Sequence, residues 1–150
     1  MENLEKYFME EAIKEAEIAF KEDEVPVGCV LVYKNKIVGR YHNECKKRND
    51  ILAHGEMLCV QNLCRSSLFF EKDLKLYVTL EPCLMCTGAI LHSNISEIIF
   101  ALPSPKDGAL YSNKTDLIIN GSKEGKFKSR LGYCGEESKN LLEKFFFEKR

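Results

Sequence analysis

Apolar residues near the start of the chain recur at the spacing of an α-helix. Between positions 3 and 21 they lie three or four residues apart, at Leu4, Phe8, Ala12, Ala16 and Ala19. This spacing puts them on one face, and glutamate and lysine occupy most of the opposite face. The pattern predicts an amphipathic helix that packs on a core.

Short apolar segments further along the chain predict β-strands. Residues 27–33 are almost wholly apolar and rich in valine, and residues 37–41 follow after a short polar connection. This arrangement is typical of a β-hairpin. Similar apolar segments predict three more strands, over residues 74–79, 96–102 and 116–120.

Helical patterns separate and follow these strands. They predict helices over residues 53–64 and 83–93 and a terminal amphipathic helix over 137–150, in which at least one of Phe145, Phe146 and Phe147 packs on the core. Alternation of strands and helices favours some parallel pairing, and the hairpin adds antiparallel pairing. We therefore expect a three-layer α/β/α sandwich around a mixed sheet of about five strands.

Length and composition limit the architecture to an ordinary globular domain. A chain of 150 residues with 45% hydrophobic and 30% charged residues can bury one core, so residues 1–150 are predicted to form a single domain. The net charge of −1 excludes a uniformly basic, sequence-blind nucleic-acid coat. Any binding of nucleic acid must therefore use local basic patches.

The cysteines are expected to be reduced thiols. We find neither a basic leader segment nor a run of 18 apolar residues, which favours a cytoplasmic protein. Disulfides are rare in that compartment, and the odd number of seven cysteines also argues against a disulfide framework. Metal binding or thiolate chemistry then becomes the main interpretation of paired cysteines.

Two short motifs together suggest a metal site. Cys83 and Cys86, in EPCLMC, lie three positions apart at the start of a predicted helix, so both sulfur atoms can reach one point. Alone, such a pair could be a redox couple, half of a structural zinc clip or part of a catalytic site. His54, in AHGE at the start of another predicted helix, offers a third ligand and favours a catalytic zinc with one position left for water.

Glu56 is the candidate proton carrier. His54 and Glu56 are two positions apart and would lie on opposite sides of a regular helix. They can face one metal only if His54 precedes the first helical turn and the residue between them is small, a condition that Gly55 meets. We therefore predict a catalytic, proton-transferring role for Glu56 and metal ligation by His54, Cys83 and Cys86.

A structural zinc site would need a fourth protein ligand. The candidates are Cys59, Cys64, His42 and His92, but none has a spacing that requires it to bind the metal. Cys59 and Cys64 are predicted to be core residues, as free cysteines usually are.

The HGE and PCLMC segments resemble the H-x-E and P-C-x-x-C signature of the zinc nucleobase deaminases. Further segments, EVPVG (24–28), YVTLEPCLMCTGAILHS (77–93), DGALYS (107–112) and LLEKFFFEKR (141–150), resemble the bacterial tRNA-specific adenosine deaminases. The resemblance covers nearly the whole chain. It implies a cytidine-deaminase-like fold, one Zn²⁺ per subunit and hydrolytic conversion of adenosine to inosine at the tRNA wobble position.

The same resemblance implies a set of recognition residues and a homodimer acting on an anticodon stem-loop. Asn43 would contact the base or ribose, and the other candidate substrate-binding residues are Val27, Ala53, Pro82 and Ser104. Basic residues beside the motifs are candidate RNA contacts: Lys46, Lys47, Arg48, Lys106, Lys149 and Arg150.

Two other functions remain open from the sequence. Deamination of a free base, such as cytosine or guanine, would use the same signature, and HGE and CTGAI also resemble cytosine-deaminase relatives. Ser104 stands where bacterial tRNA deaminases commonly carry an acidic residue, and Pro103 and Pro105 stiffen this segment. A zinc-stabilised binding module without catalysis is the third alternative, and it would give Glu56 no role.

Overall fold

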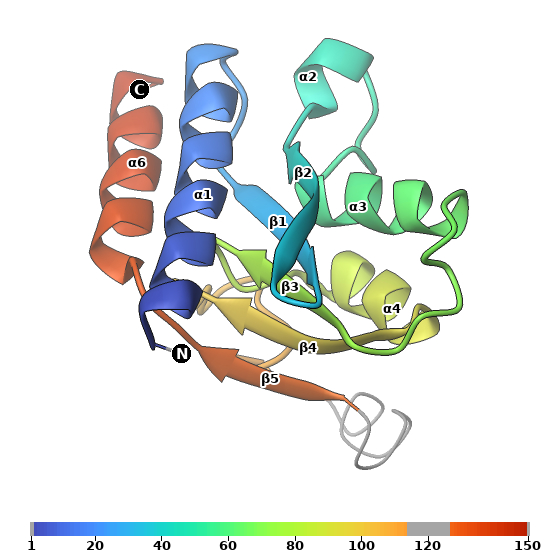
Figure 1. Cartoon of the computed structure of the whole chain (residues 1–150). Coiled ribbons are helices and arrows are strands. Elements are labelled where there is room, and N and C mark those ends of the chain that lie inside the picture. The colour runs from blue at the N-terminus through green and yellow to red at the C-terminus, as the bar shows by residue number, and fades with distance from the viewer. Residues whose placement is uncertain (1, 114–126, 150) are drawn as a thin grey trace.

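The computed structural model describes residues 2–113 and 127–149 (Figure 1). Its centre is a five-stranded sheet with the strand order β2-β1-β3-β4-β5. The strands are β1 (Gly28–Tyr33), β2 (Lys36–His42), β3 (Leu74–Val78), β4 (Ile95–Phe100) and β5 (Lys128–Leu131). β1 pairs antiparallel with β2 and β3, whereas β3, β4 and β5 run parallel to one another. The sheet is therefore mixed, as the sequence predicts.

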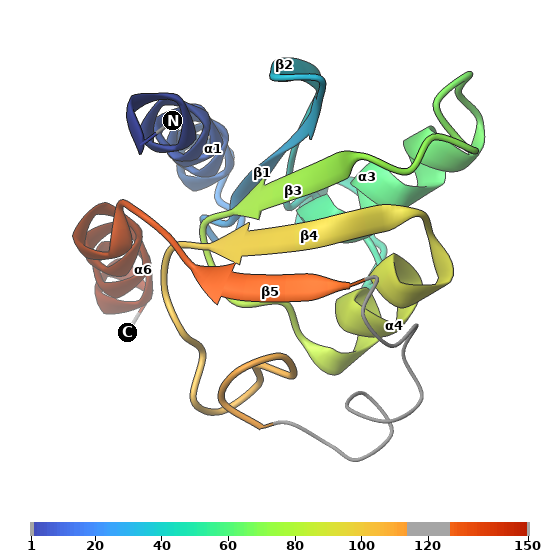
Figure 2. The ribbon, with the colours of Figure 1, turned by 60° about the horizontal axis from the view of Figure 1, so that its bottom comes forward.

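Helices cover both faces of this sheet (Figures 1 and 2). α1 (Glu2–Lys21) and α6 (Gly135–Glu148) lie side by side on one face, and α3 (Gly55–Cys64) and α4 (Leu84–His92) lie on the other. Among the described residues, no helix is long and apolar enough to cross a membrane. The three-layer prediction is confirmed.

Strand residues alternate between two apolar layers. In β1, Val30 and Val32 join Phe8 and Met9 of α1 in one buried cluster. Their neighbours Cys29 and Leu31 face the α3 and α4 side, in a second cluster. Because the β1 side chains are buried on both faces, the segment is almost continuously apolar, which is why it was recognisable as a strand.

The sequence pattern missed two elements. β5 (Lys128–Leu131) has no apolar alternation, and it is a strand because its backbone pairs with β4 at the edge of the sheet. The strand predicted over 116–120 lies outside the described residues. The polar connection after β2 contains a one-turn helix, α2 (Cys45–Arg48), in place of a simple loop.

α6 is held to the sheet near the end of β3. The Ser138 hydroxyl donates a hydrogen bond to the Thr79 carbonyl oxygen at 2.6 Å. Phe145 is buried and packs edge-on against Phe20 of α1, as predicted for one of the three adjacent phenylalanines. Phe146 and Phe147 remain exposed. This attachment brings the last helix beside the strand ends that carry the functional residues.

Gly28 allows α1 to lie directly on β1. A Cβ atom at this position would come within 2.4 Å of the Ala12 carbonyl oxygen and the Ala16 amide nitrogen. Both atoms belong to the helix backbone and cannot move aside as a side chain can. We predict that Gly28→Ala lowers the free energy of unfolding by about 1–3 kcal/mol, measured by urea denaturation at fixed zinc concentration.

Gly88→Ala is the matched control, because a Cβ at Gly88 meets nothing within 4 Å. Gly88 lies inside α4, where alanine favours the helix by up to about 1 kcal/mol. Equal stability of the Gly28→Ala chain and the parent would contradict the close contact between α1 and β1.

Candidate metal centre and active-site cavity

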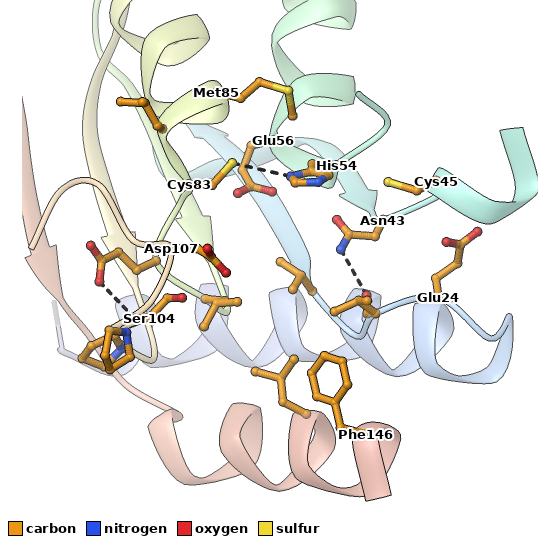
Figure 3. A pocket seen from close by; sticks show the side chains of 18 residues that line it. Glu24, Asn43, Cys45, His54, Glu56, Cys83, Met85, Ser104, Asp107 and Phe146 are labelled. Carbon is orange, nitrogen blue, oxygen red and sulfur yellow. Dashed lines mark hydrogen bonds between the residues drawn. The ribbon is translucent and has the colours of Figure 1, made fainter. Parts of the chain in front are cut away.

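A cavity of about 800 Å³ opens at one end of the strands of the sheet (Figure 3). Val27 precedes β1, Asn43 follows β2 and Leu80 follows β3, so these strand ends supply one side of it. The starts of α3 and α4, residues 103–107 and α6 supply the rest. The volume is within the range of small-ligand sites.

Three metal-binding side chains meet at one point of this cavity. His54 Nδ1 lies 3.8 Å from the Cys83 sulfur and 3.5 Å from the Cys86 sulfur. Bond lengths of about 2.3 Å to sulfur and 2.0 Å to nitrogen in a tetrahedral zinc site put such atoms about 3.5 Å apart. The three side chains therefore fit zinc in both donor type and spacing.

Local chain geometry explains how these ligands converge. His54 and Cys83 are the N-cap residues of α3 and α4, with extended backbone at φ −69° and −74°. Each precedes its helix, as predicted for His54. Cys86 lies in the first turn of α4, so its sulfur and that of Cys83 can reach the same point. The free N–H groups at helix starts favour the negative charge of thiolates.

The described residues provide three ligands and no fourth. His54, Cys83 and Cys86 form the only group of at least three metal-binding side chains found among residues 2–113 and 127–149. His42 is hydrogen-bonded to Glu15 and Glu22, each at 2.9 Å. A zinc ion held by this set would keep one tetrahedral position for a small molecule, which is typical of catalytic sites.

The other cysteine predictions have mixed outcomes. Cys59 is fully buried between α3 and the sheet, which confirms it as a core residue. Cys64 is exposed at the end of α3, so its assignment to the core is wrong. The last residue of a surface helix can face solvent whatever its apolar character.

The ligands have strongly altered acidity. The hydrogen bond from Cys86, followed by that with His54, lowers the pKa of Cys83 to about 4. The same contact with Cys83, together with burial, raises the pKa of Cys86. The hydrogen bond with Cys83 also raises the pKa of His54. These directions favour the thiolate form of Cys83 and the protonated form of Cys86, and metal binding displaces protons from such ligands.

Glu56 lies beside the ligands with one oxygen atom unused. The side chain is buried, and its Oε1 has no hydrogen-bond partner. Figure 3 shows its carboxylate next to the facing pair of Cys83 and His54. Burial, opposed in part by the hydrogen bond from its own backbone N–H, raises the pKa of Glu56 to about 7. A carboxyl group with this pKa can both accept and release a proton near neutral pH.

Asn43 ties the cavity wall to the metal centre. Its Nδ2 donates to the Val25 carbonyl oxygen at 3.2 Å, and its Oδ1 accepts from the Gly55 N–H at 2.9 Å. A Cβ on Gly55 would lie 3.3 Å from the His42 Cα, so a small residue suits this tight approach. Asn43 therefore fixes the start of α3, and it still has one N–H and one lone pair for a ligand.

The other predicted recognition residues are divided between the cavity and the core. Val27 and Ser104 line the cavity, whereas Ala53 and Pro82 are buried beside the ligands and do not line it. The Ala53 carbonyl oxygen accepts from the Glu44 N–H, and that of Pro82 accepts from the Ala109 N–H. Through these backbone hydrogen bonds, Ala53 and Pro82 connect the segments that carry His54 and Cys83 to neighbouring parts of the chain.

Three of the six predicted RNA-binding cations already have acidic partners. Lys46 and Lys149 pair with the two oxygens of Asp23, and Arg48 pairs with Glu44. The side chains of Lys47 and Lys106 are exposed and have no ion pair in the described part of the chain. Arg150 lies outside the described residues.

Several residues that line the cavity were not among the predicted site residues. Glu24 is buried, and its carboxylate accepts the backbone N–H groups of Lys46 and Lys47 at 2.9 and 2.7 Å. Leu142 and Phe146 reach the cavity from α6, distant in sequence from both motifs. For Glu24, the only indication of a site role in the local pattern was its position as an acidic residue close to the apolar strand segment.

Known proteins share both sequence and fold with this chain. Residues 2–102 match the family model for the cytidine and deoxycytidylate deaminase zinc-binding region. A tRNA-specific adenosine deaminase of Aquifex aeolicus (strain VF5) is 36% identical over 144 residues, which cover 93% of this chain and 92% of the relative.

Solved structures extend this similarity. One comes from biochemical and structural studies of A-to-I editing by tRNA:A34 deaminases at the wobble position. It has a TM-score of 0.78 and 34% identity, and the match covers 91% of this chain and 99% of that one. A guanine deaminase from Nitrosomonas europaea also has a TM-score of 0.78, over 93% of this chain and 83% of its own, but only 15% identity. At 15% identity, the match to the guanine deaminase shows a similar fold and nothing more.

We predict that Cys86→Ser abolishes tight zinc binding. Serine keeps the side-chain volume but replaces a soft thiolate ligand with a hydroxyl group, which is a poor ligand for zinc. Metal analysis after gel filtration should fall from about one zinc per chain to a small fraction of that value.

Cys64→Ser is the matched control for loss of a thiol, because Cys64 is exposed on α3. It should keep the zinc content of the parent. A Cys86→Ser chain that retains its zinc would contradict the assignment of this ligand.

Proposed function

We propose that this chain, which belongs to the cytidine and deoxycytidylate deaminase family, converts adenosine to inosine at the wobble position of a tRNA anticodon. It is a zinc-dependent hydrolytic deaminase. The observation that carries the choice of substrate is 36% identity to a tRNA-specific adenosine deaminase along nearly the full length of both chains. The similarity to the tRNA:A34 deaminase structure, at 34% identity, supports the same substrate.

The reaction replaces the exocyclic amine of adenosine with the oxygen of water and releases ammonia. We assign zinc binding to His54, Cys83 and Cys86, whose donor types and distances fit the ion. When bound, zinc acts as a Lewis acid that lowers the pKa of water to roughly 7.

Glu56 is proposed to move the protons of this reaction. Its carboxylate lies beside the ligand cluster and its Oε1 has no hydrogen-bond partner, and its pKa of about 7 lets the carboxyl group accept and return a proton. It takes one proton from water and delivers it to the ring nitrogen beside the reacting carbon. It then takes the remaining proton of the added hydroxyl group and delivers it to the departing amine, which leaves as ammonia. The carboxylate ends the cycle in its starting state.

We propose that the flipped-out base enters the cavity between Asn43 and the apolar side chains of the opposite wall. Asn43 has one N–H and one lone pair for the base or ribose, and Val27 offers an apolar surface. Ser104 would contribute its hydroxyl in place of the acidic residue common in bacterial relatives. Single-stranded loop nucleotides can be extruded at low cost, which suits an anticodon loop.

The RNA backbone is proposed to contact the exposed cations near the cavity. Lys47 and Lys106 are the best candidates, because Lys46, Arg48 and Lys149 already pair with carboxylates. Breaking those pairs would offset part of the gain from a phosphate contact. A tRNA substrate also favours the cytoplasm as the place of action.

We further propose that the chain acts as a homodimer. Ile51 and Leu52 are exposed just before His54, and Leu84 is 59% exposed directly after Cys83. Apolar side chains exposed beside the ligand segments are typical of surfaces that are covered by a partner. A second copy would then complete the rim of the cavity.

The substrate assignment predicts inosine in one RNA and no reaction with free bases. An anticodon stem-loop with adenosine at the wobble position should be converted, as seen by nuclease digestion and chromatography. The same stem-loop with adenosine moved to a neighbouring loop position, and free cytosine, guanine and adenosine, should remain unchanged. Turnover of a free base without change in the RNA would refute the proposal and favour a free-base deaminase.

The proton-transfer assignment predicts that Glu56→Gln lowers the rate of deamination by about 10²–10⁴-fold, because the amide cannot carry the proton. Zinc content should stay at the level of the parent, since Glu56 is not a ligand. Glu11→Gln provides the control for loss of a buried carboxylate; Glu11 lies on α1 and pairs with Arg40. Undiminished turnover by a folded, zinc-loaded Glu56→Gln chain would show that another group moves the proton.

A further inference from the structure

A second buried carboxylate lies close to the metal centre. Glu81 follows β3, is 3% exposed and precedes the ligand Cys83 by two positions. Its Oε2 accepts backbone N–H groups of Leu110, Tyr111 and Ser112 at 3.1, 2.8 and 3.0 Å. Its Oε1 accepts the backbone N–H of Ser104 at 3.0 Å and the hydroxyl of Ser112 at 2.6 Å.

All five of these donors come from one segment of the chain. Residues 103–112 follow β4, and Pro103, Ser104, Pro105 and Asp107 of this segment line the cavity. An isolated antiparallel bridge between Cys83 and Gly108 attaches the segment at another point. Glu81 therefore connects the strand end that carries a metal ligand to the cavity wall that faces it.

The attachment depends on hydrogen bonds to the Glu81 carboxylate. Among the described residues Glu81 forms no ion pair with lysine, arginine or histidine, so backbone and hydroxyl donors surround its charge. Hydrogen bonds to an ionised acceptor are about twice as strong as neutral ones.

The segment also fits closely around the carboxylate. A Cβ atom on Gly108 would lie 2.2 Å from the Glu81 Cδ and 2.4 Å from both oxygens. The end of a glutamate side chain can usually move away at little cost. Here the five hydrogen bonds hold it in place, so a side chain at position 108 would have to break some of them.

We propose that Glu81 is a positioning residue that fixes the cavity wall of residues 103–108 against the metal centre and thereby controls the binding of the RNA substrate. The substrate named here depends on the proposed function. Glu81 acts through Ser104 and its neighbours, since its own oxygens are occupied by donors of the segment. Its loss should weaken substrate binding and leave the zinc site and the proton carrier intact.

Glu81→Gln tests this role with little change of shape. The single amide oxygen can face the three N–H groups of residues 110–112, and the amide nitrogen then faces the Ser104 N–H, which loses its acceptor. We expect the KM for the anticodon stem-loop to rise about tenfold, the cost of one unpaired buried donor, with kcat changed by less than about threefold. Hydrogen exchange of the Ser104 amide should become faster, and zinc content should not change.

Two further variants change the segment that contacts Glu81 and leave Glu81 itself unchanged. Gly108→Ala pushes against the carboxylate and should reproduce the rise in KM. Ser112→Ala removes one hydroxyl donor and should raise KM by about two- to threefold. Glu11→Gln, which neutralises a buried carboxylate on α1, should leave both KM and Ser104 exchange unchanged.

The outcomes separate this role from the alternatives. Unchanged Ser104 exchange and KM in Glu81→Gln would overturn the proposal. Loss of zinc from Glu81→Gln, or a fall in its kcat without a rise in KM, would also overturn the proposal, because Glu81 would then act on the metal centre. A rise in KM in Glu81→Gln without any effect of Gly108→Ala and Ser112→Ala would indicate direct contact with substrate. If the parent does not convert the stem-loop, the proposed function fails, and the exchange data still decide whether Glu81 holds the segment.

Discussion

The structure depends on the approach of two helix starts that are far apart in the sequence. His54 caps α3 and Cys83 caps α4, and their donor atoms lie 3.8 Å apart at one end of the sheet. Such an approach would be unfavourable for bare thiolates without the N–H groups at both helix starts and a cation between the ligands. The positions of Glu56, Asn43 and the cavity all follow from this meeting point, because each lies on or directly beside one of the two helix starts.

The parts of the site that the sequence predicts are those with a local geometric rule. The spacing of Cys83 and Cys86 follows from helix periodicity, and the position of His54 before its helix follows from the requirement that His54 and Glu56 face one metal across the small Gly55. The roles of Glu81 and Glu24 could not be derived in this way. Their partners are backbone N–H groups in other segments, and every residue except proline carries such a group. The sequence does not predict the edge strand β5 either, because this strand is defined by its pairing with β4 and has no apolar pattern.

The acidic residues around the cavity have two different kinds of partner. Asp23 and Glu44 hold cations at the surface, whereas Glu24 and Glu81 hold backbone N–H groups in the interior. Glu56 is the exception, since one of its oxygens has no partner. The buried carboxylates with full sets of donors thus stabilise loops, and the one with an unused oxygen is available for chemistry. Among the acids that line the cavity, this contrast separates Glu56 from Glu24 and Glu81, all three of which are buried.

The place of α6 in the chain has a consequence for the order in which the protein becomes active during synthesis. All three zinc ligands lie within the first 86 residues, whereas Leu142 and Phe146 complete the cavity from the last helix. A growing chain therefore acquires its metal ligands well before the cavity is closed by α6. The cavity wall formed by α6 is therefore synthesised last, and in a growing chain the cavity stays open on that side until α6 has been made.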